Sequence, residues 1–326
     1  MEVEKGKIDV LQNCMLCPRV CGVDRSKGER GICGQTADLR LARAALHMWE
    51  EPCISGTKGS GAIFFSGCAL HCVFCQNRSI ASGETGRVVS VERLAEIMLE
   101  LENKGANNIN LVTAGQFAPQ VKTAIDIAKK HGLHIPIIYN TSAYESVETL
   151  RSLEGYVDVY LPDLKYVNAA LSDKYSHAKN YFEKASMAIE EMVRQTGELR
   201  FTDEETMEEK LAVSEYQEKS EQGEVLLITR GVIVRHLLLP GAVLDSKAVI
   251  HYLLQKYGER IFISIMNQYT PLPHVNHFEE LKRKVTPAEY EEVVAYAIAQ
   301  GIENGFIQEG DVAEESFIPE FDYTGI

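Results

Sequence analysis

Three closely spaced cysteines are the residues of this chain best suited to chemistry. Cys68, Cys72 and Cys75 form a C-x3-C-x2-C motif after the apolar run Ala62–Phe65. Three thiolates so close together can hold three corners of a cuboidal iron–sulfur cluster, which normally takes four cysteines. The fourth iron then lacks a protein ligand, as catalytic metal sites leave one position open for substrate. The alternatives are three ordinary buried cysteines or a zinc site, but structural zinc takes four ligands and His71 could be the fourth only with strain. The motif predicts a cluster with one open iron.

A second cysteine group lies near the amino terminus with the spacing C-x2-C-x3-C-x11-C: Cys14, Cys17, Cys21 and Cys33. A glycine follows the third and the fourth, which lets backbone N–H groups approach the sulfurs. Zinc and a second 4Fe–4S cluster both accept four thiolates, and the spacing does not decide between them. Free thiols in a disordered leader are the alternative. We expect one separate metal centre here, and Cys53 as a small buried hydrophobic residue.

Length, charge and composition exclude several classes of protein. The 326 residues suit one large α/β domain with an appendage, or two domains. The apolar runs are too short for a membrane span and the amino terminus lacks a signal-peptide core, so we expect a cytoplasmic protein without a membrane partner. In that reducing compartment, clustered cysteines indicate metal rather than disulfides. The net charge of −14 argues against nucleic acid as a partner.

Six apolar runs, each followed by a helical pattern, organise the chain after residue 60. The predicted strands are 62–65, 108–113, 135–139, 156–161, 232–239 and 261–266, and the predicted helices include 91–104, 144–153, 181–195, 246–256 and 287–300. Such alternation argues for a parallel sheet with right-handed crossovers. Because the chain has no dinucleotide-binding G-x-G-x-x-G motif, a barrel or partial barrel is favoured over a Rossmann sheet. In such barrels the functional residues lie at the carboxyl ends of the strands.

Two segments break this pattern and set the expected domain organisation. Residues 1–60 form a cysteine-rich metal-binding module, residues 61–310 the barrel and residues 311–326 a carboxyl-terminal tail. Within the barrel, residues 197–223 carry nine acids and three bases, a net −6 of the total −14. We expect this segment to be an exposed, solvated helical insertion, with a docking element or lid as the alternative.

Polar residues end or follow several of the predicted strands. Asp163 and Lys165 are two residues apart and point the same way off a strand, although a surface ion pair would have the same spacing. Arg235 and His236 lie in an apolar strand, where such side chains are costly unless paired or functional. A satisfied core histidine is the alternative for His236. Further candidates at strand ends are Gly115 and Gln116, Asn140 and Thr141, and Asn267 and Gln268. A simple turn is the alternative at Gly115 and Gln116.

The motifs occur in one order along nearly the whole chain: the amino-terminal cysteines, the cysteine triplet, Asn-Leu-Val-Thr, Leu-Pro-Asp-Leu-Lys-Tyr and Val-Arg-His-Leu-Leu-Leu-Pro-Gly. This set resembles the radical S-adenosylmethionine superfamily, in particular pyruvate formate-lyase activating-enzyme-like proteins with an amino-terminal four-cysteine motif. The resemblance implies an α/β fold with a partial (β/α)6 barrel. It also implies a 4Fe–4S cluster whose open iron is chelated by S-adenosylmethionine, which is then cleaved reductively to methionine and a 5′-deoxyadenosyl radical.

The resemblance implies roles for residues around this cofactor. Phe74 would pack near the cluster and the adenine. Gly115 and Gln116 stand where the family has Gly-Gly-Glu, which grips the amino group of S-adenosylmethionine, although Gln cannot supply the negative charge. Asn140 and Thr141 stand where activating enzymes have Asp-Thr-Asn, near the ribose and a monovalent cation.

Two more pairs match the activating enzymes. Asp163 stands where an aspartate helps bind the cation beside the substrate carboxylate, and Lys165 where a lysine faces the active site. Arg235 and His236 match an Arg-His strand whose histidine lies near the adenosyl group. All these side chains are expected to line one cavity with the cluster.

These features predict a radical S-adenosylmethionine oxidoreductase that abstracts a hydrogen from its substrate. In an activating enzyme that hydrogen is on a glycine Cα of a protein partner. One alternative is radical modification of another peptide or of a small molecule. An alternative of a different class is a non-catalytic iron–sulfur electron carrier. The carrier hypothesis leaves the barrel and its polar strand ends unexplained. We expect an electron donor such as flavodoxin or ferredoxin. A cover over the barrel would come from the amino-terminal module, the insertion or the tail around Ser316–Pro319.

Overall fold

Parallel strands form the centre of the computed structural model, which describes residues 10–206, 212–308 and 319–326. Seven strands of the described chain run parallel: β2 (Ser60–Phe65), β4 (Ile109–Val112), β5 (Ile137–Thr141), β6 (Val159–Pro162), β8 (Leu226–Leu237), β9 (Phe262–Met266) and β10 (Gly305–Ile307). The sheet order is β10-β9-β8-β6-β5-β4-β2-β1-β3, so most neighbours follow one another in the chain. The predicted α/β fold with a mostly parallel sheet is confirmed, and β2 to β9 include all six predicted strands.

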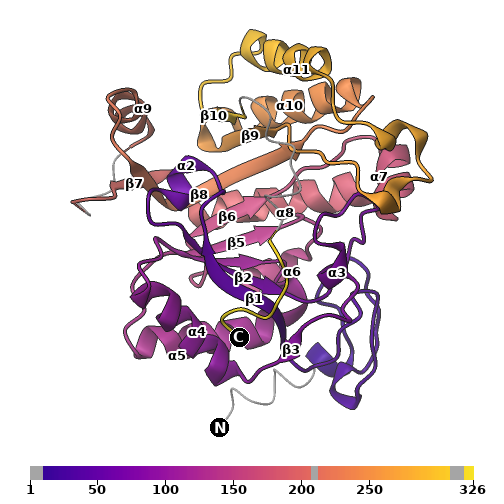
Figure 1. Cartoon of the computed structure of the whole chain (residues 1–326), viewed down its shortest axis with the longest axis vertical. Coiled ribbons are helices and arrows are strands. Elements are labelled where there is room, and N and C mark those ends of the chain that lie inside the picture. Colours follow the sequence, from indigo (N-terminus) through magenta and orange to yellow (C-terminus); the bar gives the residue numbers. More distant parts are fainter. Residues whose placement is uncertain (1–9, 207–211, 309–318) are drawn as a thin grey trace.

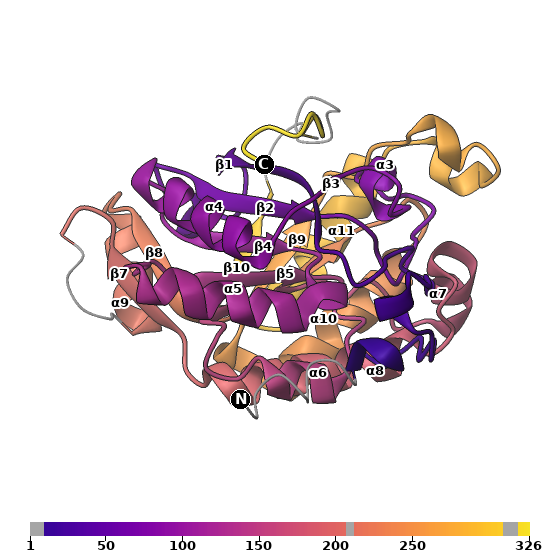
Figure 2. The ribbon, with the colours of Figure 1, turned by 90° about the horizontal axis from the view of Figure 1, so that it is seen from below.

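Helices cover the outer side of this sheet, with α4 and α5 at one side of the molecule and α10 and α11 at the other (Figures 1 and 2). Their bounds are α4 (Val91–Asn103), α5 (Ala118–Lys130), α6 (Val147–Ser152), α8 (Tyr181–Thr196), α10 (Val243–Tyr257) and α11 (Pro287–Ala299). The start of α4 is fixed by Ser90, whose side chain accepts a hydrogen bond from the backbone of Arg93. Its apolar face is buried as the sequence predicts. None of the helices in the described residues is both long and apolar enough to cross a bilayer.

Four strands were not predicted: β10, described above, and β1, β3 and β7. Strand β1 (Arg40–His47) pairs antiparallel with β2, and β3 (Arg87–Val88) pairs with β1. Strand β1 lies within the segment 1–60 that the sequence sets apart, yet it belongs to the same sheet as the barrel strands. Strand β7 (Arg200–Asp203) pairs antiparallel with the first half of β8.

The acidic segment 197–223 packs more closely than an exposed helical insertion. It holds β7 and α9 (Val213–Glu221), and Figure 1 places both at the opposite end of the sheet from the short helices α3 (Arg78–Ala81) and α7 (Ala169–Ser176). Rings of Phe201 and Tyr216 lie 4.2 Å apart, and Tyr216 packs edge-on against Phe262. These rings and Cys53, buried as expected, belong to an apolar cluster with residues of β5, β6 and β8. Glu208, Glu209 and Lys210 lie outside the described residues.

The carboxyl-terminal residues 319–326 cross the antiparallel edge of the sheet. Phe321 packs against Phe64 with ring centroids 5.4 Å apart, and Asp322 pairs with Arg43 at 2.7 Å. The backbone N–H of Ala44 donates to the carbonyl of Thr324. Of the expected tail motif Ser316–Pro319, only its last residue is among those described.

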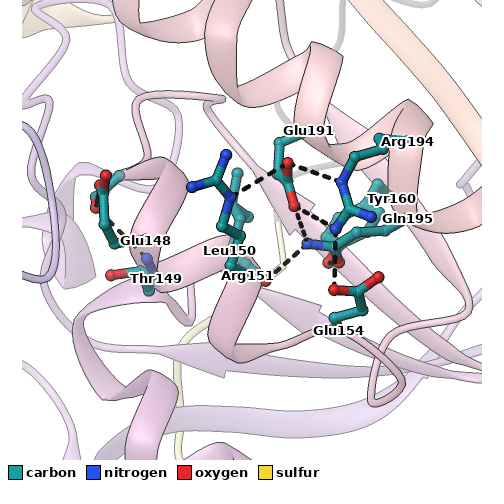
Figure 3. Close-up of polar contacts among 10 residues, drawn as sticks. Glu148, Thr149, Leu150, Arg151, Glu154, Tyr160, Glu191, Arg194 and Gln195 are labelled. Carbon is teal, nitrogen blue, oxygen red and sulfur yellow. Dashed lines mark hydrogen bonds and ion pairs between the residues drawn. The ribbon is translucent and has the colours of Figure 1, made fainter.

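A polar network fixes β6 against α6 and α8 (Figure 3). The hydroxyl of Tyr160, on β6, donates to the side-chain oxygen of Gln195 at 2.6 Å. The amide nitrogen of Gln195 donates to the carbonyl of Leu150 and to the carboxylate of Glu191, which Arg194 also contacts. The network holds the strand that carries the polar residues of the site at its carboxyl end.

Candidate active site

A cavity of about 660 Å³ opens at the carboxyl ends of the parallel strands. That volume is within the range of sites that bind a cofactor of moderate size. Ten of the residues named as candidates from the sequence line this cavity: Cys68, Cys72, Phe74, Cys75, Asn140, Thr141, Asp163, Lys165, Arg235 and Gln268. The structure therefore gathers the cysteine triplet and the ends of β5, β6 and β8 around one space.

The cysteine triplet lies in the loop that follows β2. The backbone N–H of Leu70 points to the Sγ of Cys68 at 3.4 Å, and the hydroxyl of Ser176 donates to the Sγ of Cys72 at 3.0 Å. Burial raises the pKa of Cys72 to about 11 and that of Cys75 to about 12. Each thiol must lose its proton to ligate iron, so cluster assembly here releases protons. Three sulfur donors at the wall of a cavity fit a cluster with one open iron.

Asp163 and Lys165 form an ion pair at the end of β6. Their side chains are 2.7 Å apart and both are largely shielded from solvent. Burial alone would lower the pKa of Lys165, but the Asp163 carboxylate outweighs it and the pKa is raised. The lysine therefore stays charged beside the cavity. The two residues do point the same way, as the spacing predicted, and the pair lies at the cavity rather than on the outer surface.

Arg235 contacts two carboxylates that sequence reasoning missed, Glu50 and Glu51. Its Nε donates to Glu51 at 2.8 Å, and its terminal nitrogen also contacts Glu50. Burial alone would raise the pKa of Glu51, but Arg235 outweighs it and the pKa is lowered. Asn110 donates to Glu50 at 2.9 Å. A buried cation in an apolar strand is costly, which indicated that Arg235 needs a partner. Glu50 and Glu51, which precede β2, supply two partners.

His236 does not reach the cavity. Because successive strand residues point to opposite faces, it lies on the helix side of β8 when Arg235 lies on the cavity side. Its Nδ1 donates to the carbonyl of Leu164 at 2.8 Å, and its Nε2 accepts from the hydroxyl of Ser246 at 2.8 Å. Burial lowers its pKa to about 4. The structure thus gives the expected site residue His236 the role of a satisfied core histidine.

Gly115 and Gln116 lie behind the cavity wall rather than in it. The side-chain nitrogen of Gln116 donates to the carbonyls of Ser66, Gly67 and Thr113, which joins the start of the cysteine loop to the end of β4. A Cβ at Gly115 would lie 2.6 Å from a carboxylate oxygen of the buried Glu145. Gly115 and Gln116 therefore shape the end of β4 but do not line the cavity.

Several residues that do line the cavity had no clear sequence signal. They come from β1, the loop after it, the end of β4 and β9: His47, Trp49, Thr113, Ser264 and Met266. Thr113 and Met266 end predicted strands but were not named as candidates. The others belong to elements whose face toward the cavity depends on the sheet order, which the sequence does not specify.

The four amino-terminal cysteines lie close to one another. Burial raises the pKa of Cys33, Arg25 lowers it, and the thiols of Cys14 and Cys21 raise it further. Cys17 likewise has its pKa raised to about 12, first by burial and then by neighbours that include Cys21 and Cys33. In the described residues, no three His, Cys, Asp or Glu side chains stand as ligands of one metal ion, and this holds for both cysteine groups.

Comparison with known proteins agrees with this geometry. Residues 62–199 match the family described as the radical SAM superfamily. The chain is 26% identical over 304 residues to an uncharacterized protein of Methanocaldococcus jannaschii, covering 91% of this chain and 77% of that protein.

Solved structures also share parts of this fold. The FeFe-hydrogenase maturase HydG from Carboxydothermus hydrogenoformans aligns with a TM-score of 0.50 at 13% identity, covering 79% of this chain and 56% of its own. Streptococcus suis SuiB, in a structure bound to the precursor peptide SuiA, aligns with a TM-score of 0.46 at 13% identity, covering 74% and 46%. The chain thus spans about half the length of these solved structures. The family match contains the cysteine triplet and the ends of β4, β5 and β6.

Proposed function

We propose that this chain is a radical SAM oxidoreductase that removes a hydrogen atom from its substrate. The observation that carries this proposal is the shared cavity, because Cys68, Cys72 and Cys75 line the same space as the polar ends of three parallel strands. An electron carrier needs no such cavity beside its cluster. When bound, the 4Fe–4S cluster supplies the electron that cleaves S-adenosylmethionine reductively.

The chain's own residues hold and orient the cofactor in this proposal. The three cysteines ligate iron and leave one iron open for the amino acid part of S-adenosylmethionine. Phe74 packs beside the adenine, and Asn140 and Thr141 face the ribose. Lys165, kept charged by Asp163, provides a cation for a carboxylate.

We further propose that the amino-terminal cysteines hold a second metal centre, either zinc or a 4Fe–4S cluster. Support comes from the mutual proximity of Cys14, Cys17, Cys21 and Cys33. All eight cysteines are free thiols in the described residues, which suits a reducing, cytoplasmic setting. A flavodoxin or ferredoxin is the proposed electron donor.

A peptide or protein is the proposed substrate, with the glycine Cα of a glycyl-radical enzyme as one target. Its support is the resemblance to activating enzymes together with Trp49, which is 67% exposed where it borders the cavity. Exposed aromatic rings are common where proteins bind peptides. Modification of a small molecule is the alternative.

Anaerobic reconstitution with iron and sulfide, followed by reduction with dithionite, tests the proposal. Wild-type protein supplied with S-adenosylmethionine is expected to release 5′-deoxyadenosine and methionine in equal amounts. A fully loaded, reduced protein that leaves the cofactor intact would support the electron-carrier alternative.

A further inference from the structure

We propose that the acidic end of the cavity, the end that Glu50 and Glu51 line, binds the ammonium group of a substrate. Glu50 supplies the negative charge in this proposal, and Asn110 supplies a second acceptor. The inference rests on the proposed function in one respect, because the bound molecule is taken to be the one that loses a hydrogen atom. Four observations carry it: the position of the two glutamates, the charge around the cavity, an unpaired buried oxygen and the layering of the wall.

The two glutamates line the same cavity as the cysteine triplet but at its other end. The catalytic loop, which is the loop after β2 that holds the triplet, leads into α3, whereas Glu50 and Glu51 directly precede α2 (Pro52–Ser55). Figure 1 places α2 and α3 at opposite ends of the sheet. A molecule in this space can therefore meet the catalytic loop with one part and the glutamates with another.

The charges around the cavity leave one carboxylate without a cation. Among the described residues that line the cavity, three carboxylates stand against two cations: Glu50, Glu51 and Asp163 against Lys165 and Arg235. The ion pair at the end of β6 is complete in itself, so the surplus falls on the two glutamates, which share Arg235. His47 also lines the cavity, but its pKa is lowered, chiefly by burial, so it stays neutral at neutral pH. A buried surplus charge is costly unless a cation joins it.

Glu50 has the capacity to accept another hydrogen bond. One of its oxygens contacts Arg235, and the other accepts from the side-chain nitrogen of Asn110 at 2.9 Å. A carboxylate oxygen can accept two hydrogen bonds, so each oxygen of Glu50 can take a further donor. Glu51 is used more fully, because it accepts two hydrogen bonds from Arg235 and one from Ser264. Glu50 is therefore the carboxylate that a substrate can engage.

Asn110 independently indicates a ligand that donates hydrogen bonds. It is fully buried on β4, two residues before Val112, so its side chain points to the cavity side of the sheet as that of Val112 does. Its side-chain nitrogen donates to Glu50, but its side-chain oxygen, although buried, has no hydrogen-bond partner within the described part of the chain. An unpaired buried acceptor is destabilising. An ammonium carries three N–H donors and no acceptor, so one group suits both Glu50 and Asn110.

The wall between the glutamates and the carboxyl ends of the strands is apolar. Arg235 on β8 is in register with Ser264 on β9, and Leu237 is in register with Met266, two residues nearer the carboxyl ends of the same strands. Leu237, Met266 and Val112 all line the cavity. An acidic layer is thus followed by an apolar layer and then by the catalytic loop. This order matches a molecule in which an apolar carbon chain joins an ammonium group to the reacting C–H.

The test measures the binding of three probes that share a five-carbon chain: n-pentylamine, n-pentanol and pentanoate. Calorimetric titration uses reconstituted, full-length protein with S-adenosylmethionine and no reductant, at about 0.15 M salt, where exposed surface charges are screened. We expect pentylamine to bind at least about tenfold more tightly than pentanol, and pentanoate to bind more weakly than either. Equal affinities for the amine and the alcohol, a preference for the carboxylate, or no detectable binding of pentylamine would overturn the proposal.

A charge-removing variant identifies the residue. Glu50→Gln keeps the shape of the side chain and an oxygen acceptor for Asn110, and it should weaken pentylamine binding by at least about tenfold while pentanol stays within about twofold. The matched control Glu218→Gln removes a charge at an exposed position of α9 and should leave both affinities as in wild type. Equal pentylamine affinities in the two variants would contradict the role of Glu50. If Glu50→Gln fails to fold, the comparison of the three probes in wild type still decides.

The ammonium has two possible sources, a lysine side chain of a peptide and a free alkylamine. N-acetyl-L-lysine N-methylamide carries the same group between two peptide bonds. Tighter binding of this probe than of pentylamine supports a peptide lysine, and weaker binding supports a small amine. Because binding is measured without a reductant, it does not depend on cofactor cleavage. Absence of 5′-deoxyadenosine from reduced wild type would refute the proposed function, whereas equal probe affinities would overturn the ammonium site alone.

Discussion

At the scale of single residues, Arg235 and His236 show what a strand sequence predicts and what it leaves open. Both needed a partner or a function because they lie in an apolar strand. The strand period also required that they face opposite sides. Which of them faces the cavity depends on how β8 sits between β6 and β9, and that is settled by long-range packing. The sequence therefore identified the strand correctly but assigned His236 to the wrong side.

The buried, neutral state of His236 predicts a pH effect on stability. Its pKa is lowered to about 4 in the folded protein, against about 6.5 when unfolded, so only the unfolded chain gains a proton between these values. The contribution of His236 to the free energy of unfolding is complete above pH 6.5 and falls as the pH drops toward 4. The loss between pH 7.5 and 5.5 should be about 1.3 kcal/mol in anaerobic urea unfolding. His236→Asn, which keeps a donor for the carbonyl of Leu164, should remove about that much of the pH dependence. An unchanged slope in the variant would contradict the core role.

Arg235 should contribute strongly to stability because it offsets two carboxylates. Replacing it in Arg235→Met leaves Glu50 and Glu51 buried without their cation, which should cost about 3 to 5 kcal/mol in chemical unfolding. The double variant Arg235→Met/Glu51→Gln removes one of the stranded charges and should recover part of that loss. A single variant as stable as wild type would show that the guanidinium is not needed to neutralise this site.

Asp163 should act on cofactor binding rather than on the cluster. Without its carboxylate, Asp163→Ala leaves Lys165 unpaired and free to move away from the position that the ion pair gives it. S-adenosylmethionine should then bind about tenfold more weakly, which corresponds to about 1.4 kcal/mol. Trp49 is the one tryptophan of the chain and borders the cavity, so its fluorescence can report binding. Iron content should not change, and loss of iron in this variant would count against the assignment.

At the scale of elements, long apolar strands were predictable and short or polar ones were not. Strands β2, β4, β5, β6, β8 and β9 carry runs of apolar residues that the periodicity reveals. Strand β7 reads Arg-Phe-Thr-Asp and β10 has three residues, so neither offers a pattern of useful length. Their positions come from pairing with β8 and β9. The acidic composition of residues 197–223 suggested a solvent-exposed segment. The segment also contains Phe201 and Tyr216, however, and these pack against Phe262.

The segment 197–223 should therefore be needed for stability. Glu204 accepts hydrogen bonds from the backbone of Thr57 and Lys58 and from the side chain of Asn107, which ties the segment to the sheet. Deleting residues 202–222 should destabilise the whole domain. In the finer test, Tyr216→Ala should cost roughly 3 kcal/mol. Glu218→Ala, at an exposed position of the same helix, should stay within about 0.5 kcal/mol of wild type in thermal unfolding. A deletion variant as stable as wild type would restore the view of a dispensable surface element.

At the scale of the whole molecule, the alternation of strands and helices predicted the parallel sheet and the edge that holds the site. It did not predict how the chain closes around that edge. The amino-terminal cysteine segment packs on the catalytic loop, and residues 319–326 cross β1. The contacts of residues 319–326 with β1, and that of Arg19 with His177, join residues more than 150 positions apart, and no local pattern encodes them.

The most direct test of the central claim compares wild type with Cys75→Ala after anaerobic reconstitution. Iron content, the electron paramagnetic resonance signal of the reduced cluster and 5′-deoxyadenosine formation are measured on the same samples. Wild type should show about four irons at the triplet and cleave S-adenosylmethionine when reduced, because three thiolates hold the cluster and leave one iron open. Cys75→Ala should lose that iron and all cleavage while keeping the circular dichroism spectrum of the fold. Full cleavage in Cys75→Ala would contradict the account.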